Sequence, residues 1–226
     1  DKISALWATV RKAEGLISDN VKSIAQRDGV FWIGTAMGLS RFDSRSGEWK
    51  TFTKAQGLIT NYVTSILMTD DAVWVGAAKG VGRYQDSRWK FWRKRHGLPD
   101  DFVQAVTVVD GSIWVGTRRG LCWYDISNGK WHTHEDFKGV WVNTIALDND
   151  SVWVGTKQGV AQLSLQDDAV KFYTEADGLI RNHVNRLAVE GDIVWIGTRN
   201  GLSRFDTWKN GWRNFTKAEG LPNNNV

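Results

Sequence analysis

Regularly spaced tryptophans constrain this chain more than any other feature, because 14 of its 226 residues are Trp. One series opens a Trp-[Ile/Val]-Gly-[Thr/Ala] segment at Trp32, Trp74, Trp114, Trp153 and Trp195. A second series occupies positions 7, 49, 89, 131, 170 and 212, with Val at 170, and a glycine follows each position eight residues later. Two series that share one period of about 41 residues predict an internal structural repeat.

Each period contains four short segments with the composition of β-strands. In the clearest copies these are residues 63–66, 72–76, 38–42 and 49–53, all rich in β-branched and aromatic residues. Turn residues such as Asp110-Gly111 separate the first segment from the second. The pattern therefore predicts four antiparallel strands joined by tight hairpins.

The second strand of the repeat is apolar on both of its faces, with Val30 and Trp32 on one and Phe31 and Ile33 on the other. A four-stranded sheet cannot bury both faces alone, so repeats must pack against their neighbours. Radial packing of such sheets predicts an all-β β-propeller of four-stranded antiparallel blades. Eleven tryptophans are then expected in the core: Trp7, Trp32, Trp49, Trp74, Trp89, Trp92, Trp114, Trp131, Trp153, Trp195 and Trp212.

The whole chain, residues 1–226, is predicted to be one domain with five complete blades and one redundant outer strand. The blades are expected at about residues 17–53, 59–93, 99–134, 140–174 and 180–216, and the extra strand at 5–11. Two arrangements fit this count: a five-bladed ring with overlapping ends, or a piece of a longer propeller. The second is favoured slightly, because closure of a six-bladed ring needs a further stretch of sequence.

The fullest copy of the repeat reads Gly178-Leu-Ile-Arg-Asn182-His-Val184, followed by Val194-Trp-Ile-Gly-Thr-Arg-Asn-Gly-Leu202 and Phe205-Asp206. This pattern resembles the two-component regulator propeller repeat, and the resemblance covers nearly the whole chain. Members of that family are mostly periplasmic sensor regions of bacterial hybrid histidine kinases, many of which respond to oligosaccharides. Related propellers are secreted proteins and, more distantly, a lyase.

The resemblance implies a non-catalytic ligand-binding or interaction module, periplasmic or extracellular, that senses a carbohydrate or another polar ligand. One alternative is a lyase- or hydrolase-like propeller enzyme that acts at the mouth of the central channel. Another is a scaffold subunit that binds other protein domains or subunits, with the basic outer strand at residues 88–96 as its interface. The Lys and Arg of that strand are better explained as protection of an exposed sheet edge.

Composition excludes several classes of protein. A net charge of +4 mildly favours anionic partners but falls short of a specific nucleic-acid binder. No apolar run approaches the ~20 residues that cross a bilayer, so this segment is not expected to insert into a membrane. Cys122 is the only cysteine, which excludes an intrachain disulfide and a cysteine metal cluster.

Motifs for catalysis, cofactors and metals are missing from the sequence. There is no nucleophile elbow, phosphate loop or His-Glu-x-x-His motif, so no catalytic residue and no cofactor is predicted. His132 and His134 share a strand face as zinc ligands can, but a solvated pair is the better interpretation and no metal site is predicted. Asp148-x-Asp150 is interpreted as a hairpin turn. His183 is the only histidine on the predicted ligand face that could serve an enzyme.

Propeller topology places two sets of loops on one face, around the channel mouth. The loop before each first strand carries Asn20, Asn61, Asp101 or Asn182, and the loop between strands two and three carries Lys79, Arg118, Arg119, Lys157 or Arg199. The asparagines have a structural alternative, a side-chain turn that starts the strand. The basic residues are not dictated by the repeat, because blade one has Ala36 and Met37 there.

Departures from the repeat add two aromatic candidates. In the fourth repeat Gly139 precedes Val142 by three residues, and this shorter loop carries Trp141. Trp123 stands where other repeats have Arg41, Arg83 or Arg204. Both are candidates for stacking on a ligand, although the short loop could instead draw Trp141 into packing. The predicted ligand site comprises Trp141, Arg118, Arg119, Lys157, Arg199, Asn61, Asn182, His183 and Trp123.

Overall fold

The computed structural model describes residues 11–148 and 150–226, which form five four-stranded antiparallel sheets. The strands of each sheet are paired in chain order, as a series of hairpins. Six single turns of 3-10 helix connect or flank the sheets, and the described residues contain no α-helix. The predicted all-β architecture with five four-stranded blades is therefore confirmed.

The blades, numbered in chain order, contain the following strands. Blade 1 has β1 (Val21–Arg27), β2 (Val30–Thr35), β3 (Leu39–Asp43) and β4 (Glu48–Phe52). Blade 2 has β5 (Val63–Met68), β6 (Val73–Ala77), β7 (Gly80–Gln85) and β8 (Arg88–Trp92). Blade 3 has β9 (Val103–Val109), β10 (Ser112–Thr117), β11 (Gly120–Asp125) and β12 (Lys130–Thr133). Blade 4 has β13 (Val142–Leu147), β14 (Ser151–Thr156), β15 (Val160–Ser164) and β16 (Val170–Tyr173). Blade 5 has β17 (Val184–Glu190), β18 (Ile193–Thr198), β19 (Leu202–Asp206) and β20 (Gly211–Phe215).

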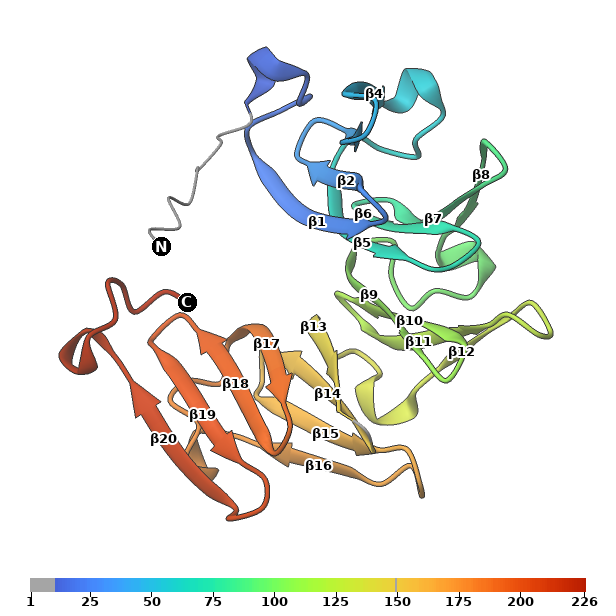
Figure 1. The fold of residues 1–226 in the computed structure, drawn as a ribbon. Helices are drawn as coiled ribbons and strands as arrows, with labels where there is room; N and C mark the ends of the chain where they lie inside the picture. The colour runs from blue at the N-terminus through green and yellow to red at the C-terminus, as the bar shows by residue number, and fades with distance from the viewer. Residues whose placement is uncertain (1–10, 149) are drawn as a thin grey trace.

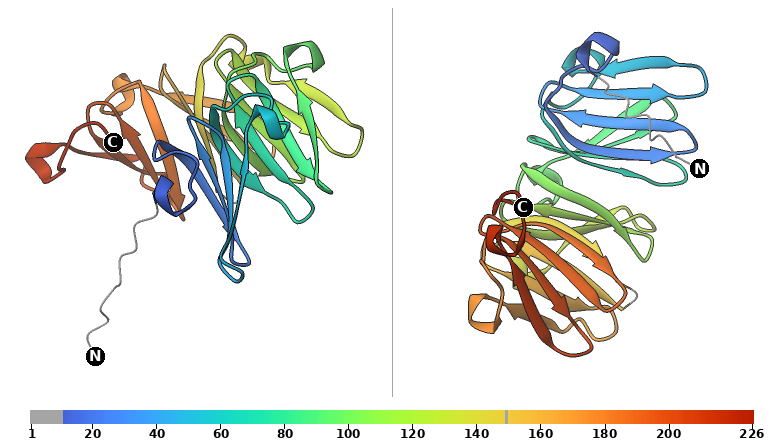
Figure 2. Two further views of the ribbon diagram at one scale, coloured as in Figure 1. Left: turned by 90° about the horizontal axis from the view of Figure 1, so that it is seen from above. Right: turned by 60° about the vertical axis from the view of Figure 1, so that its left-hand side comes forward.

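The blades stand around a common axis with their first strands innermost (Figure 1). The first strands of successive blades contact one another, from β1 through β5, β9 and β13 to β17. Blades 1 and 5 are separated by a gap, also visible in the right-hand view of Figure 2, so the described residues form an open arc and not a closed five-bladed ring. The extra outer strand is expected at residues 5–11, of which 5–10, including Trp7, lie outside the described part. The single-domain boundary of 1–226 stays a prediction.

Four of the six 3-10 turns follow a fourth strand and lead to the next blade, whereas the first precedes blade 1 and the last follows blade 5. The turns are η1 (Lys12–Glu14), η2 (Lys54–Gln56), η3 (Lys94–His96), η4 (Glu135–Phe137), η5 (Glu175–Asp177) and η6 (Lys217–Glu219). In η2 the Thr53 hydroxyl accepts a hydrogen bond from the Ala55 backbone, and Gly57 ends the turn at φ 93°. Glycine adopts this left-handed conformation without the steric strain of a Cβ.

Neighbouring blades pack through a glycine on each second strand. A Cβ added to Gly34 would lie 2.5 Å from Val63 of the next blade, and one on Gly76 would lie 2.7 Å from Val103. Gly116 and Gly155 meet Val142 and Val184 of their next blades in the same way. The glycine of the Trp-x-Gly segment therefore sets the close approach of one blade to the next. On Gly197 the equivalent position is filled by Val226, the last residue of the chain, at 3.1 Å.

The first tryptophan series lies in the core as predicted. Trp32, Trp74, Trp114 and Trp153 are buried, whereas Trp195 is half-buried on blade 5, which has no complete blade after it among the described residues. The second-series tryptophans among the described residues, Trp49, Trp89, Trp131 and Trp212, are half-buried, and the repeated glycine packs on the tryptophan of the following repeat. A Cβ on Gly15, for example, would lie 2.6 Å from Trp49.

Blade 4 departs from this packing in two linked ways. Val170 replaces the outer-strand tryptophan, and Gly139, the repeat glycine of the preceding connection, has no atom within 4 Å of an added Cβ. The connection is closed instead by Phe137, which is fully buried and lies 5.7 Å from Phe172 of β16, centroid to centroid. Phe137 thus fills the space between this shorter connection and blade 4, and Trp141 is not needed to fill it.

The face of blade 1 that points away from blade 2 is apolar and exposed, and we expect the chain to associate through it. Ile24 on this face is 61% exposed, whereas its counterpart Ile66 on blade 2 is covered by blade 1 and is 9% exposed. Because an exposed apolar sheet face is a site of association, we expect the 226-residue chain to form dimers or larger species that use this face. Sedimentation velocity across a concentration series measures this, and Ile24→Lys should shift the chain toward monomer. A monomer at every concentration would contradict the expectation.

Candidate ligand site at the channel mouth

Backbone hydrogen bonds bring the two predicted loop sets together at the channel mouth. The residue after each second strand donates its N–H to the carbonyl of the residue before the first strand: Arg118 to Phe102 and Lys157 to Trp141, both at 3.2 Å. Blades 1 and 2 have the same bond, from Ala36 to Asn20 and from Ala78 to Tyr62, at 3.1 Å. Each of these blades therefore holds two side chains next to each other, which we call a mouth pair.

In blades 3 and 4 the mouth pair consists of an aromatic ring and a cation in contact. The guanidinium carbon of Arg118 lies 3.5 Å from the ring centroid of Phe102, and Nζ of Lys157 lies 3.1 Å from that of Trp141. Cations over aromatic faces are attracted by the ring quadrupole, by about 0.5–1 kcal/mol at exposed sites. The rings therefore fix the direction of two otherwise flexible side chains.

These pairs are continuous from blade to blade. Arg118 also lies 4.7 Å from the ring of Trp141 on the next blade, and Phe102 lies 6.1 Å from the ring of Tyr62 on the previous one. Blade 5 carries His183 and Arg199 at the positions of the mouth pair, and their charges couple to Lys157. We call this set the mouth arc: Tyr62, Phe102, Arg118, Trp141, Lys157, His183 and Arg199.

The mouth arc is electropositive. Burial, with the neighbouring charges of Arg199 and Arg118, lowers the pKa of Lys157. Burial, Arg199 and Lys157 lower the pKa of His183, which favours the neutral imidazole. Within residues 11–148 and 150–226, none of the three cations forms an ion pair with a carboxylate. Like charges are thus gathered here without a compensating acid.

The repeat does not require these cations for folding. Blades 1 and 2 make the same backbone bond with Ala36 and Ala78 in place of Arg118 and Lys157. The cations and aromatic rings belong to blades 2 to 5 and are richest on blades 3 and 4, so the mouth has one distinct side. A pseudosymmetric ring with such a side can offer one site where identical blades would offer several.

The repeated asparagines are structural caps. Oδ1 of Asn61 accepts the Lys54 N–H and Oδ1 of Asn182 accepts the Glu175 N–H, each at 2.8 Å and each seven residues upstream. Asp101 does the same for Lys94. In the first repeat the equivalent residue is Asp19, and not Asn20 as the sequence suggested. The side chain fixes the preceding 3-10 turn, which differs from the predicted strand-starting turn, and ligand binding by Asn61 and Asn182 stays a prediction.

Arg119 and Trp123 lie outside the mouth arc. Arg119 lines a hollow at the outer part of the blade 3 to blade 4 connection, together with Lys94, Pro99 and Lys138. Trp123 is on β11. Its ring stacks between those of Trp114 at 5.5 Å and His132 at 5.3 Å, and it packs against the core cluster between blades 3 and 4. The structure therefore brings Arg118, Trp141, Lys157, His183 and Arg199 together but separates them from Arg119 and Trp123.

The other polar clusters show no metal site in the described part of the chain. No group of three or more His, Cys, Asp or Glu side chains with metal-binding geometry occurs there. His134 Nδ1 lies 3.8 Å from Asp136, and His132 stacks on Trp123. On β8, Trp92 is buried and Trp89 stacks on Phe91 at 5.5 Å, so the aromatics of the basic strand are engaged in packing.

The polar side chains inside the mouth connect adjacent first strands. The Thr64 hydroxyl donates to the Val103 carbonyl, and Asn143 Nδ2 donates to the Val184 carbonyl, each at 2.7 Å. Asn185 Nδ2 donates to the Val226 carbonyl at the same distance. Each donor lies two residues after a residue of the mouth arc: Tyr62, Trp141 or His183. These hydrogen bonds therefore support the positions of those arc residues.

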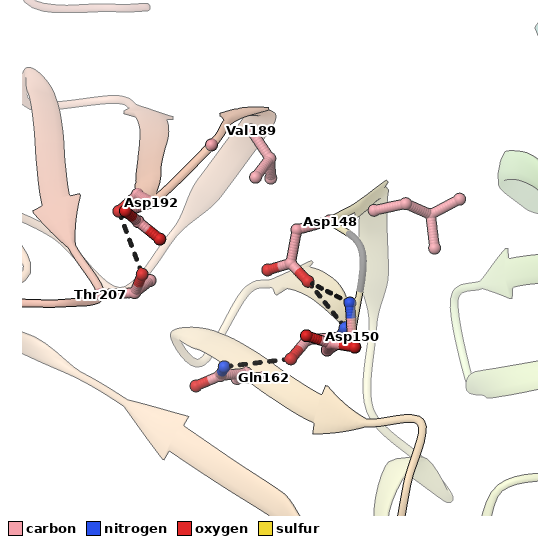
Figure 3. A pocket seen from close by; sticks show the side chains of 9 residues that line it. Asp148, Asp150, Gln162, Val189, Asp192 and Thr207 are labelled. Carbon is pink, nitrogen blue, oxygen red and sulfur yellow. Dashed lines mark hydrogen bonds between the residues drawn. The ribbon is translucent and has the colours of Figure 1, made fainter.

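A second hollow lies between blades 4 and 5, lined by Asp148, Asp150, Gln162, Val189, Asp192 and Thr207 among others (Figure 3). Its carboxylate at Asp148 is already occupied: Oδ1 accepts the N–H groups of Asp150 and Ser151, and Oδ2 accepts the Trp153 indole N–H at 2.7 Å. Asp148 therefore organises the predicted hairpin turn and anchors a core tryptophan.

Sequence reasoning missed Tyr62 and Phe102. Both occupy the position directly before a first-strand valine, as Trp141 and His183 do. The signal was present as a column of Tyr, Phe, Trp and His, but alignment on tryptophan alone made Trp141 look unique.

Comparisons with known proteins agree with the repeat pattern. The profile of the family described as two component regulator propeller matches residues 15–37. No curated protein matches the sequence significantly. The part of the chain that the structure describes contains no helix with the length and apolar character needed to cross a membrane.

Three solved structures have folds similar to that of this chain. The extracellular domain of the hybrid two component system BT3049 from B. thetaiotaomicron has a TM-score of 0.78 and 22% identity, over 91% of this chain and 31% of that one. The extracellular domain of BT4673 from the same organism has a TM-score of 0.75 and 23% identity, over 91% and 29%. A catalytically inactive virginiamycin B lyase from Staphylococcus aureus, crystallised with quinupristin, has a TM-score of 0.69 and 18% identity, over 87% and 69%.

The chain spans less than a third of the length of the two extracellular domains. Identities at this level establish the shared propeller fold. Together with the five sheets, they identify this chain as a β-propeller, and its residues 15–37 match the two component regulator propeller repeat.

Proposed function

We propose that the chain is a non-catalytic sensor propeller that binds a polar ligand, a carbohydrate, at the mouth arc. The observation that carries the proposal is the one-sided gathering of rings and cations on the loops of blades 2 to 5, which the fold itself does not require. Aromatic faces beside polar groups are typical of ligand pockets.

The fold neighbours support a sensor role and its location. Two of them are extracellular domains of hybrid two component systems. We therefore propose a periplasmic or extracellular location and a partner that is either a small polar ligand or a further domain of a signalling protein.

The competing enzyme function needs a general acid or base at the mouth. The charges of Arg199 and Lys157 act on His183, and within residues 11–148 and 150–226 it forms no ion pair with a carboxylate. A His-acid pair is the arrangement that proton transfer commonly uses. The fold neighbour that is a lyase is the reason to test for turnover directly.

A glycan array tests the proposed function. We expect the wild-type chain to retain a restricted set of saccharides and to leave them chemically unchanged after long incubation, as mass spectrometry would show. Arg118→Glu should remove the signal, because it places a carboxylate between Phe102 and Trp141. Arg119→Glu is the matched control with the same change in charge outside the arc and should keep it. New saccharide products that form in the presence of the protein would establish the enzyme instead.

A further inference from the structure

We propose that the ligand of the mouth arc is an acidic saccharide whose carboxylate or sulfate lies between Arg118, Lys157 and Arg199. This inference rests on the proposed function and narrows the class of its ligand. Its starting point is that three cations converge on one rim without any acid in the described residues to pair with them.

The first argument is electrostatic. Mutual repulsion among Arg118, Lys157 and Arg199 disfavours the charged state of Lys157, in addition to the effect of its burial. Like charges held together are destabilising, and an anion bound among them relieves the repulsion while it gains charge-assisted hydrogen bonds. A neutral sugar would gain the hydrogen bonds but would leave the repulsion in place.

The second argument is preorganisation. Arg118 lies between two rings, at 3.5 Å from Phe102 and 4.7 Å from Trp141, and Lys157 lies over Trp141. Long cationic side chains lose rotamer freedom when they bind a ligand, and fixing them beforehand lowers that loss. The rings therefore hold the donors of two cations at a fixed place, which suits recognition of one anionic group more than diffuse attraction of a polymer.

The third argument is the contrast with the rest of the chain. On blades 1 and 2 the same backbone positions carry Ala36 and Ala78. Other exposed cations lie over rings on the outer strands at longer distances, such as Lys171 over Tyr173 at 4.7 Å and Lys90 over Trp92 at 5.0 Å. Cations in close contact with a ring, at 3.1 and 3.5 Å, and next to a further cation are found on blades 3 and 4 at the mouth.

Isothermal titration with matched saccharides tests this inference. The probes are trigalacturonic acid, its fully methyl-esterified form, a heparin-derived tetrasaccharide and cellotetraose, so that carboxylate, sulfate and neutral sugars are separated. We expect at least one acidic probe to bind more than tenfold tighter than its neutral counterpart. Its affinity should fall as salt rises, because ionic attraction is screened.

Variants connect the binding to the arc. Arg118→Ala should weaken the acidic probe about tenfold, the lower end of the range for a hydrogen bond to a charged group. Any binding of the neutral probe should weaken less, because a neutral sugar loses a hydrogen bond but no charge pairing. Arg119→Ala removes the same charge from the adjacent residue and should have no effect. Thermal melts of both variants verify that each is folded.

The possible results separate the two proposals. Equal affinity for trigalacturonic acid and its methyl ester would overturn the acidic class and leave the carbohydrate sensor standing. Binding of neither acidic nor neutral saccharides would overturn both. Tighter binding of a 12-nucleotide single-stranded DNA, lost in Arg118→Ala, would assign the arc to nucleic acid and overturn the inference.

Discussion

Trp153→Ala should lower the free energy of unfolding by about 3–5 kcal/mol, the range for removal of a buried large aromatic side chain. Trp153 has no exposed surface, and its ring lies 5.9 Å from that of Tyr173 and 6.0 Å from that of Phe205 on the next blade. The substitution removes one ring contact between blades 4 and 5, that with Phe205, and also the 2.7 Å hydrogen bond from the indole to Asp148.

Urea denaturation followed by circular dichroism measures this loss. For a chain of this size the change corresponds to a lower Tm by roughly 6–20 °C. Trp208→Ala is the matched control, because Trp208 is 84% exposed. It should change the unfolding free energy by no more than about 0.5 kcal/mol. Equal losses in the two variants would show that the tryptophan series does not form the core.

The fold was predictable because one physical requirement recurs in every blade. A strand that is apolar on both faces needs a neighbour on each side, and the glycine after its tryptophan permits the close contact with the next valine, as between Gly34 and Val63. The period of the sequence therefore predicts the arrangement of blades. The open arc was not decided by the sequence, because both arrangements of the ends fit the same number of strands.

The site was predictable only in part. The topology predicted that the two loop sets lie on one face, which the structure shows, and the predicted site contains five of the seven arc residues. Arg118 and Arg119 are adjacent in the sequence, but only the contact with Phe102 and Trp141 distinguishes them. Trp123 was predicted to stack on a ligand, but its ring stacks on Trp114 and His132 within its own blade. The sequence does not distinguish a tryptophan packed between two rings from one that is exposed.

The asparagines illustrate a different difficulty. A repeated Asn in a loop before a strand fits a ligand contact and a structural cap equally well. The backbone N–H that Asn61 accepts belongs to Lys54, seven residues earlier, and this distance in the sequence exceeds that of the common side-chain turns. Only the path of the 3-10 turn brings the two residues together.

Trp141→Ala should weaken ligand binding about five- to 150-fold, with a much smaller effect on stability than Trp153→Ala. The Trp141 ring fixes both Lys157 and Arg118. Without it, Lys157 must be ordered on binding and Arg118 is held by Phe102 alone, at up to about 0.5–1.5 kcal/mol per side chain. These costs span that loss of affinity. The folded protein loses the two cation–π contacts, about 0.5–1 kcal/mol each, and the packing of a half-buried ring, which costs less than the loss of a fully buried one.

Two further variants distinguish positioning from packing. Trp141→Phe keeps an aromatic face for the cations and should recover most of the affinity. Tyr62→Ala is the matched control, because Ala78 stands beside Tyr62 in its mouth pair and the only cation over its ring among the described residues, Lys22, is 6.0 Å away, so the change should affect binding less. Titration of the saccharide identified on the array and urea denaturation of each variant give the two measurements. If Trp141→Ala lost 3–5 kcal/mol of stability with unchanged affinity, Trp141 would belong to the core and the arc would lose its central residue.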